Sequence, residues 1–230
     1  MAASNDVVGT LATTVYDRLR DDIMCGELAP GEKLRVEFLR ARYGAGTSPI
    51  REALNRLSSD GFVMQEDQKG FRVAPVSRDE LIELIKTRCW LEGVALRESA
   101  ANGDQAWEEG IVLAFHRLSR VPKTTDPDDP ELNPKWEELH RAFHMTLLTA
   151  CGSGLLLGYC GQLADRAKRY RQLAVIVNYP ERNELDEHRD LMEAMLSRQP
   201  DKAVALLDAH YQRTGQQIEE FAPVLEQAGE

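Results

Sequence analysis

The chain has 230 residues, of which 43% are hydrophobic and 29% charged, so it is long enough to bury at least one core. The first residues lack the basic and apolar segments of a secretory signal, and every apolar run stops short of the roughly 18 residues of a membrane span. We therefore expect a cytoplasmic protein with no membrane partner. The four cysteines include no CxxC pair, which favours reduced thiols over disulfides or a cysteine zinc site.

The net charge of −10, taken alone, argues against a nucleic-acid partner, because binding to phosphate is driven largely by Lys and Arg. The charge is unevenly distributed, however. Residues 1–75 carry 10 Lys and Arg against 11 Asp and Glu, whereas residues 76–230 carry 18 against 27. The acidity belongs to the C-terminal two thirds, so it does not exclude DNA binding by the N-terminal third.

The first 76 residues change hydrophobic period often and are rich in turn residues. We expect a helix at 13–26, a turn at 30–31, a short helix from 36 to a break at 44–46, a helix at 47–61, and strands at 62–65 and 70–76. Thr47 or Ser48 is the expected N-cap of the third helix, with Pro49 in its first turn. This order of elements is typical of a winged helix-turn-helix.

Basic and polar side chains mark one face of this predicted module. Arg51 falls in the first turn of the third helix, where a recognition helix meets bases or phosphates, and Asn55 follows one turn later. Lys69 lies at the hairpin, where a wing would reach a groove. A single exposed arginine is equally well explained as a solvated surface residue, but the ordered set favours DNA binding.

From residue 77 onward every segment has a helical period. We expect helices at 77–101, 106–121, 135–152, 155–177, 181–199 and 200–225, with one long loop at 123–134. Ser77 is the expected N-cap of the first, with acidic residues in its opening turn. The predicted fold is therefore mainly α, with a winged helix-turn-helix domain at 1–77 and an all-α bundle at 78–230.

Histidines recur on the apolar faces of three of these helices. His140 and His144 are four residues apart and share one face, and His188 and His210 lie on the apolar stripes of the last two helices. Side chains that project into a bundle core from different helices are the usual source of a metal site, and imidazole favours Zn, Ni, Cu or Fe. The alternative is that each is a hydrogen-bonded core residue, as we expect for His116, which has no partner.

The stretches DRLRDDIMCGELAPGEKL, SPIREALNRLSSDGFV and KGFRV together resemble the N-terminal domain of the GntR family of bacterial transcription regulators. The resemblance covers about residues 12–76 and implies that Arg51 contacts DNA and Gly70 forms the wing turn. Many family members carry a second arginine four residues before Arg51, where this chain has Thr47, so its operator is expected to differ. The residues predicted to form the DNA interface are Arg35, Thr47, Ser48, Arg51, Asn55, Lys69 and Gly70.

Residues 80–220 resemble the FCD ligand-sensing domain of the same family, through Arg88 and Glu92 on the first helix and a histidine on each of the last two. In metal-binding members, the aspartate of a D..FH motif and three histidines hold one divalent ion, and a carboxylate effector completes the coordination. Here HRAFH occupies that motif, so His140 stands where aspartate is usual. The resemblance predicts a metal held by His140, His144, His188 and His210, with Zn favoured and Ni as the second choice.

A carboxylate effector also needs nearby cations, and we select Arg88, Arg169 and Arg171, each of which could equally pair with surface acids. The combined prediction is a homodimeric repressor that binds a palindromic operator and responds to a small carboxylate, or dicarboxylate, at the metal. The nearest resemblance within the family is to the carbon-starvation-induced regulator (CsiR) branch. The main alternative is a metal-dependent hydrolase with Glu187 as general base, and a metal-storage bundle is a third possibility.

Overall fold

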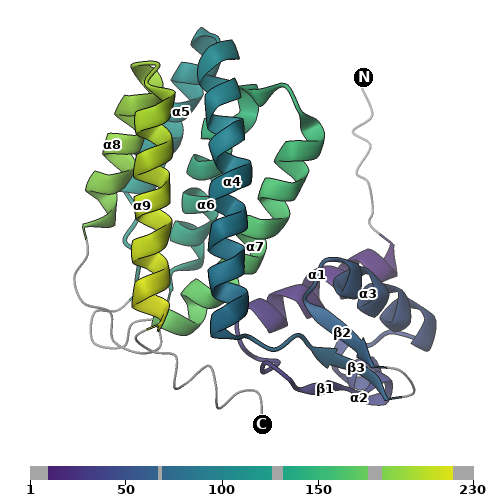
Figure 1. Ribbon diagram of the computed structural model, residues 1–230. Coiled ribbons are helices and arrows are strands. Elements are labelled where there is room, and N and C mark those ends of the chain that lie inside the picture. The colour runs from purple at the N-terminus through teal and green to yellow at the C-terminus, as the bar shows by residue number, and fades with distance from the viewer. Residues whose placement is uncertain (1–9, 67–68, 126–131, 176–182, 220–230) are drawn as a thin grey trace, which may run out of the picture. The chain divides into compact units, whose positions relative to one another are not determined.

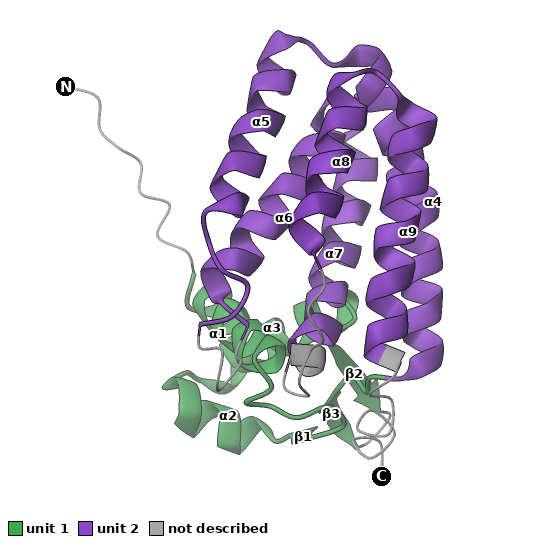
Figure 2. Ribbon diagram, turned by 90° about the vertical axis from the view of Figure 1, so that its left-hand side faces the viewer, with its two compact units in different colours: residues 1–76, 226–230 green, residues 77–225 purple. Residues whose placement is uncertain are grey.

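The computed structural model describes residues 10–66, 69–125, 132–175 and 183–219. These divide into two compact units, of which the first ends at Val76 and the second begins at Ser77 (Figure 2). The fold is mainly α, with a small sheet confined to the first unit, as the sequence predicted. Within the described ranges no helix has the length and apolarity needed to cross a membrane.

The first unit is a winged helix-turn-helix (Figure 1). Its helices and strands are α1 (Leu11–Met24), β1 (Lys33–Leu34), α2 (Val36–Tyr43), α3 (Thr47–Ser59), β2 (Val63–Glu66) and β3 (Gly70–Val73). The antiparallel sheet has the strand order β1-β3-β2. Apolar residues of α1 and α3 meet at its core, where Leu19, Ile50 and Leu54 are fully buried. Burial of one stripe on each helix leaves the opposite face of α3 free for a partner.

Two local expectations for this unit were wrong. Strand β1 was not predicted, because two residues carry no readable alternation and depend on pairing with β3, where Leu34 lies opposite Phe71. The N-cap of α3 is Gly46, in extended conformation, with no side-chain cap hydrogen bond. Thr47 and Ser48 are already helical, so their exposed hydroxyls are not used as caps.

The second unit is a helical bundle. It consists of α4 (Arg78–Asn102), α5 (Gln105–Ser119), α6 (Pro134–Leu148), the 3-10 turn η1 (Thr149–Cys151), α7 (Gly154–Val175), α8 (Glu184–Leu196) and α9 (Pro200–Glu219). Ser77 caps α4 by accepting a hydrogen bond from the Glu80 N–H, as predicted. The parts of the predicted helices at 176–177, 181–182 and 220–225, and loop residues 126–131, lie outside the described residues.

The long α4 lies beside α9 and also packs on α7, while α5 packs on α6 and α8 (Figure 1). Phe143 of α6 and Leu96 of α4 are fully buried in the core that these helices share. This packing turns the inner faces of α6, α8 and α9 toward one another, and those faces carry the histidines.

Candidate metal centre and nucleic-acid interface

The exposed face of α3 carries the polar residues that the sequence selected. Thr47, Ser48, Arg51 and Asn55 are all exposed, while Ile50 and the other apolar residues of the helix are buried. Arg51 has no hydrogen bond, ion pair or ring contact within the described part of the chain, and the same is true of Arg35 on the segment before α2. Unpaired, solvated guanidinium groups are available for phosphates and base edges at little desolvation cost.

Other arginines of this unit hold the fold together. Arg42 pairs with Asp22 at 2.8 Å, which ties α2 to α1. Arg56 of α3 lies 4.2 Å from the centre of the Tyr16 ring, and Arg72 bridges Glu66 at 3.1 Å. The structure therefore separates arginines that have a partner within the unit from those that have none among the described residues, a distinction that the sequence does not make.

The predicted wing is the β2–β3 hairpin. Gly70 opens β3 with a φ of +91°, a conformation that L side chains rarely adopt. Lys69 beside it is exposed. Asp67 and Gln68, which follow β2 in the sequence, lie outside the described residues. The hairpin thus presents at least one cation where a wing would meet DNA.

The four histidines selected from the sequence come together in the second unit. His140 and His144 lie one turn apart on α6, His188 lies in the second turn of α8, and His210 lies in the middle of α9. All four are buried, with exposed fractions of 2–5%. Each can offer one nitrogen such that all four nitrogens lie within 4.8 Å of one another. The Nε2 atoms of His144 and His188 are 3.2 Å apart, close to the roughly 3.4 Å that zinc ligands at about 2.0–2.1 Å from a tetrahedral ion require.

The charge state of the cluster suits a metal ion. Burial lowers the pKa of His140 and of His144 well below the usual value, and the neighbouring histidines and arginines lower both further. Both rings are therefore neutral near pH 7, with a lone pair available for coordination. The buried Nδ1 of His140 has no hydrogen-bond partner among the described residues. A purely structural histidine core leaves that atom without a partner, whereas a metal ion coordinated through it would satisfy it.

A buried polar network lies against His144. The Tyr211 hydroxyl donates to Glu92 at 2.7 Å, accepts from Arg88 at 2.5 Å, and lies 3.5 Å from the Nδ1 of His144. Arg88 also donates to Glu92 at 2.8 Å. Burial alone would lower the pKa of Arg88, but Glu92 and Tyr211 outweigh it and keep the guanidinium charged. Tyr211 was not selected from the sequence, because its position depends on how α9 packs on α4.

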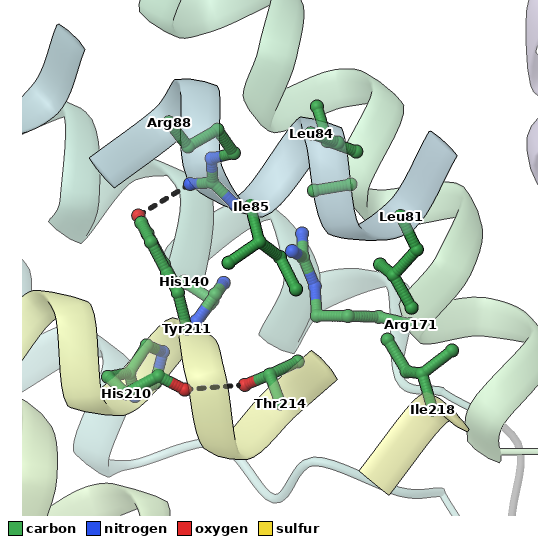
Figure 3. Close-up of a pocket in the computed structure, with 11 residues that line it drawn as sticks. Leu81, Leu84, Ile85, Arg88, His140, Arg171, His210, Tyr211, Thr214 and Ile218 are labelled. Atoms are coloured by element: carbon green, nitrogen blue, oxygen red, sulfur yellow. Dashed lines mark hydrogen bonds between the residues drawn. The ribbon is translucent and has the colours of Figure 1, made fainter. Parts of the chain in front are cut away.

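A small cavity of about 30 Å³ adjoins the cluster (Figure 3). His140 and His210 line one part of it, and Arg88 and Arg171 line another. Arg171 pairs with the buried Glu137 of α6. Arg169 is buried on α7 but is not among the residues that line this pocket, because residues two apart on a helix face different directions.

A winged helix-turn-helix with exposed polar and basic residues on α3 is the fold of a DNA-binding protein, and in this chain a helical bundle with a buried histidine cluster follows it. The sequence matches the description "Bacterial regulatory proteins, gntR family" over residues 11–73 and "FCD domain" over residues 83–213. The chain belongs to the GntR family and carries an FCD domain. FCD domains are known to bind metals.

Curated relatives agree with this assignment. The transcriptional regulator BphR of Paraburkholderia xenovorans is 36% identical over 214 residues, which cover 93% of this chain and 87% of BphR. The transcriptional repressor GlaR of Escherichia coli is 34% identical over 199 residues, which cover 85% of this chain and 90% of GlaR. These relatives are regulators and not enzymes, so the hydrolase alternative is discarded. The resemblance to the carbon-starvation-induced regulator branch of the family stays a prediction.

Solved structures show the same fold. The chain aligns with Escherichia coli McbR/YncC with a TM-score of 0.75 at 20% identity, over 93% of this chain and 99% of that one. A regulator from Rhodococcus sp. RHA1 aligns with a TM-score of 0.72 at 19% identity, over 92% of this chain and 99% of the Rhodococcus chain.

Proposed function

We propose that this protein is a repressor whose affinity for operator DNA is set by a divalent metal ion and a small carboxylate effector in the FCD domain. One observation carries the proposal: four buried imidazoles converge beside a pocket that also contains two arginines. The name of the relative GlaR supports repression as the mode of regulation.

His140, His144, His188 and His210 are the residues that would hold the ion. Neutral imidazoles favour Zn, with Ni as the second choice, over the hard ions Mg and Ca. When bound, the metal ion would act as a Lewis acid that attracts a carboxylate oxygen. Since these four ligands carry no charge, an anionic effector is favoured at this site.

The charge balance of the pocket favours a dicarboxylate. Arg88 is paired with Glu92 and Arg171 with Glu137, so the two guanidinium charges are already offset. A divalent ion then adds two positive charges that its four direct ligands do not offset, and a dianion that binds the ion can offset both. Arg88 and Arg171 are our candidates for contacts with the effector, whereas Arg169 lies away from this pocket.

For the DNA interface, we propose that Arg35, Arg51 and Lys69 contact bases and phosphates. The polar residues Thr47, Ser48 and Asn55 on the same face of α3 complete the interface. We further propose a homodimer that binds a palindromic operator in the cytoplasm. A stripe on α4 supports self-association: Ile82, Trp90 and Val94 are spaced at helical intervals and are 45%, 62% and 52% exposed. A second copy of the chain would cover this stripe.

Regulation requires only that the effector bind the DNA-competent and DNA-incompetent states with different affinity. A coupling free energy of about 1–3 kcal/mol changes operator affinity by roughly 5- to 150-fold.

The test starts with selection of binding sites from random double-stranded DNA, with the zinc-loaded full chain as bait. Affinity for the selected DNA is then measured by fluorescence anisotropy with zinc, with a chelator, and with zinc plus single mono- and dicarboxylates. The proposal expects a palindromic consensus and an affinity that depends on both metal and acid. Selected DNA that binds equally well under all of these conditions would contradict the regulatory role.

A further inference from the structure

Glu187 joins the histidine cluster to the surface of the second unit. Its Oε2 lies 2.8 Å from the Nδ1 of His210, and its Oε1 accepts from Arg213 at 2.8 Å. The Glu187 and His210 side chains are 17% and 7% exposed, whereas Arg213 is 56% exposed. Glu187 lies on α8, and its carboxylate reaches His210 on the neighbouring helix α9.

This contact decides which nitrogen of His210 faces the cluster. A neutral imidazole carries one N–H and one lone pair, and an ionised carboxylate can only accept. A carboxylate at Nδ1 therefore keeps the proton on that nitrogen and leaves the Nε2 lone pair for a metal.

The same carboxylate alters the electrostatics of the centre. The four imidazoles contribute no negative charge, so the charge of a divalent ion is not offset by its direct ligands. Glu187 places one negative charge a single imidazole ring away from the ion. The charge of Arg213 offsets it only weakly, because water screens a side chain that is more than half exposed.

We propose that Glu187 is a positioning residue of the metal centre, which holds His210 in the tautomer that coordinates through Nε2 and supplies the negative charge that four neutral imidazoles lack. The inference rests on the metal site proposed above. The competing interpretation is a surface ion pair between Glu187 and Arg213 that contacts His210 without consequence for metal binding.

Three variants separate these interpretations. Glu187→Gln keeps an acceptor for the Nδ1–H of His210 but removes the charge, and Glu187→Ala removes both. Glu193→Gln is the matched control, since Glu193 is exposed on the same helix and no ion pair involves it among the described residues. Far-ultraviolet circular dichroism of each metal-free protein verifies that it is folded.

The measurements are the Zn²⁺ dissociation constant, from competition with a chromophoric chelator, and the tautomer of His210 in the metal-free protein, from ¹⁵N NMR of the imidazole. We expect Zn²⁺ affinity to fall about tenfold in Glu187→Gln and up to about 100-fold in Glu187→Ala, in line with the loss of such outer-shell partners. Glu193→Gln should match wild type. The Nδ1–H tautomer should persist in Glu187→Gln and be lost in Glu187→Ala.

Wild-type Zn²⁺ affinity in Glu187→Ala, or an unchanged His210 tautomer in that variant, would overturn the role of Glu187 while leaving the metal site intact. A wild-type chain that takes up no Zn²⁺ would overturn the metal site itself, and the role of Glu187 with it.

Discussion

Two arginines of α3, five residues apart, are expected to affect different properties when each is replaced by alanine. Loss of Arg51 should weaken DNA binding, and loss of Arg56 should lower stability. Arg51 is exposed and has no internal partner among the described residues, so Arg51→Ala should leave the free energy of unfolding almost unchanged. Loss of its base or phosphate contact should weaken operator binding by about 1–3 kcal/mol. At about 1.4 kcal/mol for each factor of ten, that is roughly a 5- to 150-fold rise in the dissociation constant.

Arg56 is the internal comparison. Its guanidinium lies over the Tyr16 ring at 4.2 Å and 3.5 Å from the Thr13 hydroxyl. Loss of this partly exposed cation–π contact should lower the free energy of unfolding by about 0.5–1 kcal/mol. Operator affinity should stay near that of wild type, because the side chain is held against α1.

Both variants are assayed as full chains, by anisotropy with a selected operator at several salt concentrations and by urea unfolding. If Arg51 contacts a phosphate, the salt slope of binding should fall by about one in Arg51→Ala. Full operator affinity in Arg51→Ala, combined with a large loss of operator affinity in Arg56→Ala, would refute the division of arginines into those with and those without an internal partner.

Glu137→Gln leaves the Arg171 charge without its carboxylate partner, so urea unfolding should show a free energy of unfolding lower by about 3–5 kcal/mol. Calorimetry with a carboxylate should show tighter binding, because Arg171 is then available to it. Unchanged stability would contradict the role of this ion pair. Trp90→Glu places a charge in the exposed stripe of Ile82, Trp90 and Val94 on α4, and should shift the molar mass measured by light scattering toward that of the monomer. An unchanged molar mass would exclude this face as the dimer interface. Gly70→Ala forces a side chain into a positive-φ position, which should cost roughly 1–2 kcal/mol and weaken operator binding; wild-type behaviour would show that the wing tolerates another conformation. Removal of zinc by a chelator should lower the melting temperature, since a ligand at about 100 times its dissociation constant contributes about 2.7 kcal/mol, and an identical melting temperature would argue against a bound ion.

The winged fold was readable from sequence because its signals are local. Glycine stops, a proline in the first turn of a helix and the apolar stripe of α3 each lie within one segment. Strand β1 was missed because its two residues acquire their conformation only through pairing with β3.

The metal cluster was only partly a local prediction. The spacing of His140 and His144 fixes a shared face on one helix, but convergence with His188 and His210 depends on the rotation of three helices. The contact of Glu187 with His210 depends on the same rotation, which is why a reading of α8 alone could not find it.

The arginines show the same limit. Glu92 lies four residues after Arg88, so that ion pair is visible in the sequence. The partner of Arg171 is Glu137, 34 residues away. Sequence alone could not decide whether Arg169 or Arg171 faces the pocket, since the orientation of α7 within the bundle decides it.

The central claim is that four histidines hold a metal ion, and the most direct test is the metal content of untagged protein by elemental mass spectrometry. Wild type should contain about one Zn or Ni per chain, as expected for a single tetrahedral or expanded site, and His144→Ala should contain none while its winged domain remains folded. A metal-free wild type, even after reconstitution with Zn²⁺ and Ni²⁺, would contradict the claim.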